Sequence, residues 1–418
     1  MKLNLRQWLL LALGAVVALP YAVRAHGAWP VGALVIPLAA VAIVLSGPQP
    51  WRELWRDRVT RLLLAFLVVT ALSLPVGLLV FHNSQGLRSY AYQVALVLNF
   101  AAGFLILRRR DDIEMFIRGY VAVAAVAAAA LALYLLQAGI LQNAHSFHGS
   151  ASLDATIYGW PNSFSVLLSV ALVLCLYVVS TTEIRWLRRA YIAAAVALAT
   201  CLVLTFSKTG WVVFGVAAWM LWVRYWKRTY IAALIALAVV GGIVLYLVTN
   251  ESFHMQVFTL RTLGERFLIL GSVLRYVNPL VLLFGSGSLN LDTLLASHAH
   301  DQLVPGVELG GLSTHNELLA VLVKGGLLSL VLLVAALVIV GNRVRNLARS
   351  GDALGRYWYA AVWAIVASLF AGETLHYWPV ASLFWVMAGA MARSLAVTEA
   401  AAERPKKSTE SSEHAVPA

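Results

Sequence analysis

The sequence predicts an all-α polytopic membrane protein with about twelve transmembrane helices. Hydrophobic residues make up 61% of its 418 residues, and charged residues only 12%. The apolar residues gather into stretches of about 20, the length that an α-helix needs to cross the hydrocarbon core of a bilayer. Basic residues recur in alternate intervals between these stretches, which is the pattern of a chain that passes back and forth through a membrane.

Nine apolar stretches precede residue 249, and they assign residues 1–248 to transmembrane helices 1–9. They lie at residues 8–24, 28–46, 62–81, 91–107, 116–137, 161–180, 190–206, 210–225 and 229–248. We expect the first stretch to be a membrane helix and not a cleaved signal peptide, because a second stretch follows almost at once.

Three more stretches follow the long interval 249–314, and they assign residues 315–397 to transmembrane helices 10–12. They lie at residues 315–340, 357–375 and 379–396. Residues 398–418 are polar, contain two prolines and lack apolar periodicity. We therefore expect them to form a disordered cytoplasmic tail.

Most of the 31 Lys and Arg residues fall on one side of this arrangement, in every second interval. By the positive-inside rule that side is cytoplasmic, and an even number of helices places both termini there. The formal net charge of +12 is therefore explained by membrane topology, and it does not indicate nucleic-acid binding. The few basic residues elsewhere run against this rule and need another reason: Arg24, Arg88, Lys208, Arg261, Arg266, Arg275 and Lys324.

The interval 249–314 concentrates polar residues in a chain that is otherwise largely apolar, and we expect it to be a periplasmic loop. An amphipathic helical stretch is predicted around 256–277, and the interval carries Arg261, Arg266, Arg275, His298, His300 and Asp301. Its apolar segment PLVLLFGSGSLN is too short to cross a membrane, so we expect a re-entrant or buried element that leads into a Gly-Ser turn. A basic, histidine-bearing loop at the mouth of a helical bundle suits an anionic, lipid-linked substrate.

Three segments resemble, in order and spacing, the O-antigen ligase and polymerase superfamily. They are LTFSKTGW at 204–211, ERFLILGSVLRYVNPLVLLFGSGSLN at 265–290 and HNELLAVLVKGGLLSL at 315–330. The superfamily consists of polytopic glycosyltransferases of the GT-C class, which transfer a glycan from undecaprenyl diphosphate at the periplasmic face. The resemblance covers residues 160–340 by motif and the whole chain by its number of spans, and it implies a GT-C-like fold.

His315, at the start of its predicted helix, is the catalytic residue that the resemblance implies. Transfer from a lipid diphosphate needs a base for the acceptor hydroxyl and stabilisation of the leaving diphosphate. A histidine with an ordinary pKa of about 6.5 accepts a proton at neutral pH. The alternative is that His315 only caps or lines the helix entrance together with Thr314 and Asn316.

Arg266 is the residue that the resemblance assigns to the donor diphosphate. Helical geometry places Arg261, Glu265 and Arg275 on one face, and it leaves Arg266 pointing elsewhere, in need of its own partner. The alternative is an ordinary interfacial arginine.

Lys208 stands where the family usually has an arginine. Lysine neutralises a phosphate as a point charge, but it lacks the bidentate fork of a guanidinium. Arg88, in the predicted outer loop NSQGLRSYAYQ, is the candidate to compensate, and the alternative for Arg88 is a snorkelling interfacial side chain. Lys324 replaces an acid found in many relatives, so we expect it in an intramembrane polar pair or a cavity.

Further candidates for the pocket or the acceptor site are Asn316, His298, His300, Asp301, Glu373 and His376. Glu373 and His376 end the eleventh predicted helix on its outer side, where either one orients His315 or lines the pocket. The two histidines and the aspartate of the long interval are interpreted as an acceptor-facing loop. A metal cluster is the alternative for them, but no third histidine or thiolate is visible. We expect no metal and no cofactor.

Together with the resemblance, these residues predict an O-antigen ligase of the bacterial inner membrane. Such an enzyme moves polysaccharide from undecaprenyl diphosphate to the lipid A-core oligosaccharide at the periplasmic face. The same chemistry serves an O-antigen polymerase or a protein O-oligosaccharyltransferase. A polysaccharide or lipid transporter is the alternative from another class, for which inverted repeats and broken helices with charges near the midplane are expected.

Overall fold

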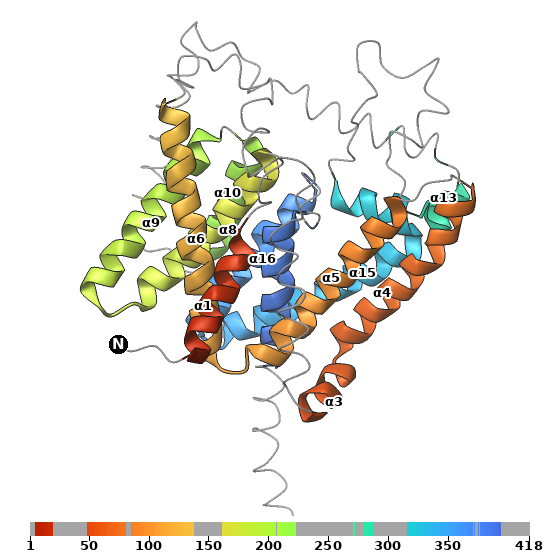
Figure 1. Ribbon diagram of the computed structural model, residues 1–418, viewed down its shortest axis with the longest axis horizontal. Helices are drawn as coiled ribbons and strands as arrows, with labels where there is room; N and C mark the ends of the chain where they lie inside the picture. The colour runs from red at the N-terminus through yellow and green to blue at the C-terminus, as the bar shows by residue number, and fades with distance from the viewer. Residues whose placement is uncertain are drawn as a thin grey trace, which may run out of the picture.

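The computed structural model describes residues 5–19, 48–80, 85–137, 161–205, 207–222, 279–287, 316–370 and 377–393, together with Gly271, Val277, Gly372 and Leu375. Every regular element within these residues is a helix, which confirms the predicted all-α class (Figure 1).

The helices before the long interval are α1 (Leu5–Ala18), α3 (Pro48–Arg56), α4 (Arg58–Pro75) with its π-helical continuation η2 (Val76–Val80), α5 (Gln85–Ile106), α6 (Arg110–Gln137), α8 (Pro161–Thr181), α9 (Arg185–Leu204) and α10 (Lys208–Trp222). Within and after it come α13 (Pro279–Phe284), α15 (Glu317–Arg349), α16 (Ala353–Leu369) and a final helix at residues 378–393.

Six of the described helices are long and apolar enough to cross a membrane, and each coincides with a predicted span. They are Arg58–Leu79, Ser89–Ile106, Arg110–Leu133, Asn162–Thr181, Arg185–Leu204 and Glu317–Arg349. Shorter apolar helices, α1 and α10, occupy two more predicted stretches, and α16 and the final helix occupy another two. The stretches 28–46 and 229–248 lie outside the described residues, as do most of 249–314 and all of 398–418. The number of twelve therefore stays a prediction.

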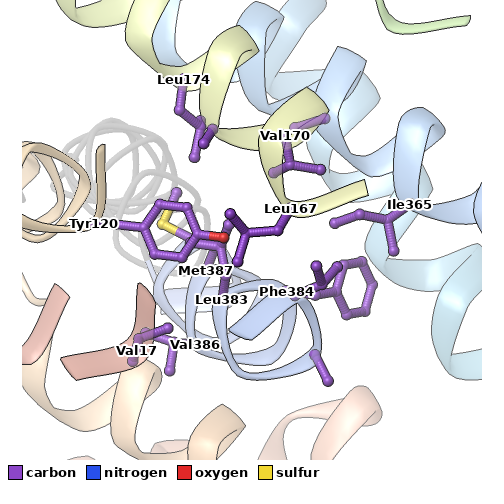
Figure 2. Packing of buried hydrophobic residues seen from close by; sticks show 14 of the residues in the cluster. Val17, Tyr120, Leu167, Val170, Leu174, Ile365, Leu383, Phe384, Val386 and Met387 are labelled. Carbon is purple, nitrogen blue, oxygen red and sulfur yellow. The ribbon is translucent and has the colours of Figure 1, made fainter. Parts of the chain in front are cut away.

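The final helix lies at the centre of the bundle. Its side chains are buried on every face from Tyr377 to Ala392, as expected of a helix that other helices enclose. Figure 2 shows residues of four other helices packed around it: Val17, Tyr120, Leu167 and Ile365. By contrast, α9 is peripheral, since Trp186 is 70% exposed on it. An apolar helix with this much exposed surface faces lipid in a membrane.

One end of the bundle carries basic residues from several helix junctions, and we call it the basic end. Ion pairs tie these junctions together: Arg6–Asp112 at 2.7 Å, Arg110–Asp352 at 2.6 Å, Arg393–Glu53 at 3.7 Å, and Arg343–Asp57. Junctions far apart in the sequence therefore share one end of the bundle, in agreement with the predicted alternation of basic intervals. Their assignment to the cytoplasm stays a prediction.

Candidate functional site

The end opposite the basic end gathers the first residues of α5, α8, α10 and α15 and the last residues of α16 (Figure 1). Polar side chains and glycines from distant parts of the sequence meet here. Three local arrangements fix the helix ends: a hydroxyl network at the start of α10, an interlock of glycines around α15, and a pair of hydrogen bonds to Leu375.

The hydroxyl network involves the motif LTFSKTGW, and it explains why α9 ends and α10 begins within this motif. The Oγ of Ser207 accepts the backbone N–H of Gly210 at 3.3 Å, and so caps the N-terminus of α10. The same hydroxyl donates to Oδ1 of Asn162 at 2.9 Å and accepts from Oγ of Ser165 at 2.8 Å. Because Ser207 and Ser165 are buried, these bonds hold the starts of α8 and α10 together.

Lys208 is the first residue of α10, so the hydroxyl network fixes its backbone. The N-terminus of a helix carries partial positive charge and backbone N–H groups without intrahelical partners. The start of α10 therefore offers backbone N–H groups and partial positive charge to an anion. The donor-binding role of Lys208 stays a prediction.

The second arrangement is a tight turn that follows α13 and packs into a break in α15. Gly326 interrupts α15 with a φ of 81° and a ψ of 175°. The break frees backbone carbonyls, and the turn satisfies them. The N–H of Ser286 donates to the carbonyl of Val323 at 2.9 Å, and the N–H of Gly287 donates to that of Lys324 at 3.2 Å. The Lys324 carbonyl also accepts the hydroxyl of Ser73 at 3.3 Å.

Five glycines make this approach possible, and we call them the glycine interlock: Gly77, Gly86, Gly285, Gly287 and Gly326. A Cβ atom on Gly326 would lie 2.4 Å from the carbonyl oxygen of Leu283, and one on Gly287 would lie 2.5 Å from that of Ser73. Cβ atoms on Gly77 or Gly86 would lie 2.6 Å and 2.3 Å from the carbonyl oxygen of Gly287. These neighbours are backbone atoms, so any larger residue forces the elements apart.

The glycine interlock joins two of the three motifs that carry the family resemblance. It docks residues 279–287, which follow Arg266 in the chain, onto the helix that begins just after His315. The expected Gly-Ser turn is confirmed, whereas the element before it is not buried as a whole: Val281 is buried, but Leu280 is 61% and Phe284 is 64% exposed. The break at Gly326 differs from the expectation, because the apolar stretch 315–340 predicts one continuous helix.

The third arrangement lies at the N-terminus of α15. Asn316 caps the helix, since its Oδ1 accepts the N–H of Leu319 at 3.0 Å. Glu317, in the first turn, is only 1% exposed, and its Oε2 accepts the N–H of Leu375 at 2.9 Å. Tyr92 of α5 donates its hydroxyl to the carbonyl of the same Leu375 at 2.9 Å. Both backbone polar groups of Leu375 are thus bound by side chains.

The structure places only part of the predicted site. Asn316 is described in full, whereas Lys208 and Arg88 are described as backbone positions, at the starts of α10 and α5. Outside the described residues lie Arg266, His315, His298, His300, Asp301, Glu373 and His376. The roles of all these residues stay predictions.

Sequence reasoning did not identify Ser207, Glu317 or Tyr92. Two of them had a local signal, since a serine before a helix and an acid in its first turn are typical of helix starts. Tyr92 had none, because its partner lies 283 residues away.

These features define a multi-pass helical membrane protein with polar helix starts gathered at the face opposite its basic end. Residues 193–334 match the family model described as O-Antigen ligase. The match supports the resemblance to the O-antigen ligase and polymerase superfamily that the sequence motifs indicate. Members of the family are glycosyltransferase-like enzymes that act on lipid-linked glycans. No curated protein matches the chain.

Proposed function

We propose that this protein is an O-antigen ligase, which transfers polysaccharide from undecaprenyl diphosphate to the lipid A-core oligosaccharide. The observation that carries the proposal is the family match, because residues 193–334 contain Lys208, Arg266 and His315 together. The interlock of the second and third motifs supports it, as does the capped helix start at Lys208.

In the proposed reaction His315 is the general base. It accepts the proton of the acceptor hydroxyl while that oxygen attacks the anomeric carbon of the donor sugar. The bond from that carbon to the diphosphate breaks on the opposite face, so the configuration inverts and no sugar-enzyme intermediate forms. Arg266 and Lys208, with Arg88, neutralise the diphosphate as it leaves. In the proposed step these basic side chains, and no metal or cofactor, neutralise the charge that develops on the leaving diphosphate.

The remaining candidates belong to the acceptor side of the proposed site. They are Asn316, His298, His300, Asp301, Glu373 and His376. The proposed location is the bacterial inner membrane with the site facing the periplasm, where donor and acceptor are both lipid-anchored. This orientation rests on the positive-inside rule applied to the basic end.

Lipopolysaccharide profiles of a deletion strain test the proposal. Loss of a ligase leaves lipid A-core bands without a ladder, and lipid-linked polymer accumulates. Loss of a polymerase leaves the core plus a single repeat, which would assign the chain to the polymerase branch. An unchanged ladder, with loss of glycans from proteins, would assign it to the protein O-oligosaccharyltransferases.

A transporter remains the second candidate, because α15 is broken beside Lys324. In many transporters the carbonyls at such a break coordinate a cation. Here the carbonyls of Val323 and Lys324 accept backbone N–H groups of the turn at 286–287, and that of Gly325 accepts the hydroxyl of Ser329 at 2.7 Å. The break is thus occupied by protein donors, which favours interfacial chemistry over ion-coupled transport.

A further inference from the structure

We propose that Glu317 and Tyr92 are positioning residues of the transfer reaction, which hold the chain at Leu375 against the N-terminus of α15. This inference rests on the proposed function. It adds two residues to which neither the family resemblance nor the sequence assigns a role. We call the two hydrogen bonds to Leu375 the Leu375 clamp.

The clamp acts on the chain segment that connects α16 to the final helix. Leu375 lies between the end of α16 and the final helix. Its N–H is bound by a carboxylate from α15, and its carbonyl by a phenol from α5. Three parts of the bundle are therefore joined through one residue. Because both backbone groups of Leu375 are bound, the segment can neither slide along α15 nor rotate away from it without losing a bond.

The burial of Glu317 shows that its carboxylate serves a specific purpose. Taking an ionised carboxylate out of water is costly unless hydrogen bonds compensate, and such residues are rarely fully buried. Glu317 is 1% exposed, and its position in the first turn of α15 favours negative charge. The hydrogen bond from the Leu375 N–H to Oε2 compensates part of the cost of this burial. Glu317 is thus suited to fix a backbone N–H firmly.

The clamp adds to the packing of Leu375, whose side chain is 3% exposed and belongs to the hydrophobic core. A cavity of about 30 Å³ lies directly beside the clamp, and Glu317, Tyr92 and Leu375 all line it. The remaining lining residues come from α4, α5, α15 and the final helix, and most are apolar. On the side of this gap, the two hydrogen bonds fix the backbone of Leu375. The ring of Tyr92 also contacts Trp378 edge to face, with centroids 5.6 Å apart.

The position of the clamp connects it to the proposed chemistry. Glu317 lies two residues after His315, and Leu375 is flanked in the sequence by Glu373 and His376. The clamp fixes residues 317 and 375 relative to each other, and these two positions are the sequence neighbours of the proposed site residues. Misplacing catalytic groups by about 1 Å costs on the order of a hundredfold in rate.

Three substitutions separate the clamp from other roles of the same residues. Glu317→Leu removes the acceptor, whereas Glu317→Gln keeps an oxygen that accepts the Leu375 N–H but carries no charge. Tyr92→Phe removes only the hydroxyl and keeps the ring against Trp378. Ser382→Ala is the matched control, because it removes a different bond between α5 and the final helix, that of Asn99 to Ser382 at 3.0 Å.

Hydrogen–deuterium exchange of the peptide that contains Leu375 measures the clamp directly, without any assumption about function. In the purified full-length protein we expect Glu317→Leu to speed exchange of that amide by about tenfold or more, because its partner is removed. Glu317→Gln should speed it only slightly, and Ser382→Ala should leave it unchanged. An amide equally protected in Glu317→Leu and in the wild type would overturn the clamp.

Steady-state transfer between extracted lipid-linked polysaccharide and lipid A-core tests the positioning role. We expect Glu317→Leu to lower kcat by about ten- to a hundredfold with little change in the donor KM. Tyr92→Phe should lower kcat by several-fold, and Glu317→Gln should retain most activity. If Glu317→Gln fails as badly as Glu317→Leu, the charge matters and not the clamp, and the inference is wrong. It is also wrong if Glu317→Leu loosens the amide but keeps kcat. A wild-type protein without transfer activity would instead refute the proposed function, and the exchange result would still stand on its own.

Discussion

Gly326→Ala tests the glycine interlock at the position where α15 breaks. The combination of φ 81° and ψ 175° is one that essentially only glycine adopts, and forcing another residue into it costs about 1–3 kcal/mol. The added methyl group would also lie 2.4 Å from the carbonyl oxygen of Leu283. Relieving that overlap costs about 1–3 kcal/mol more. The sum, about 2–6 kcal/mol, is a large part of the stability of an ordinary domain.

Gly341→Ala is a matched control in the same helix, because a Cβ at Gly341 would meet no atom within 4 Å. Alanine is favoured over glycine within a helix by about 1 kcal/mol, so this control should be neutral or slightly stabilising. The assay is the thermal stability of detergent-purified protein followed by size-exclusion chromatography, together with rescue of the lipopolysaccharide ladder in a deletion strain. We expect Gly326→Ala to lower the melting temperature and to lose the ladder. If the two variants behave alike, the reasoning about the glycine interlock is wrong.

Further predictions concern the donor side, the cap of α10 and the topology. Arg266→Ala should abolish transfer in isolated membranes and weaken donor retention. In the same assay Lys208→Ala should lose most activity, whereas Lys208→Arg should keep or improve it. A fully active Lys208→Ala would show that the alignment at LTFSKTGW is wrong. Ser207→Ala removes the cap of α10 and should cost about 0.5–2 kcal/mol of stability, seen as a lower melting temperature. Ser180→Ala, which loses a hydroxyl bond to a carbonyl of its own helix, is its control, and an equal effect of the two would contradict the capping role. Ser288→Cys should react with an impermeant thiol reagent in intact spheroplasts, and labelling only after lysis of the inner membrane would contradict the predicted topology.

The helices and the Gly-Ser turn followed from the sequence because each depends on local composition. Apolar stretches of about 20 residues identify a span wherever they occur. The run PLVLLFGSGSLN predicts an element too short to cross a membrane and then a Gly-Ser turn, and the short helix α13 followed by residues 285–287 agrees with both. The shared position of the basic junctions followed in the same way from their alternation along the chain.

The parts of the site that escaped prediction depend on contacts between distant residues. Two adjacent glycines in an apolar run look like ordinary helix residues, and only the turn at 285–287 reveals why the helix breaks at Gly326. Glu317 looks like a solvent-exposed helix start until its partner, 58 residues further on, is known. Pairings of this kind leave no periodic signal in a single sequence.

The most direct test of the central claim is single-turnover transfer by wild-type protein and by His315→Gln, with donor binding measured on the same samples. Glutamine keeps the size and hydrogen bonding of the residue but not its basicity, so we expect the rate to fall by about 10²–10⁴-fold while the donor still binds. Wild-type activity should also persist after exhaustive treatment with a metal chelator. A His315→Gln rate close to the wild-type rate would contradict the proposal that His315 is the base. The proposal would also be contradicted if the chelator abolished wild-type activity and Mg²⁺ or Mn²⁺ restored it. That result would point to Asp301 and its neighbouring histidines as metal ligands.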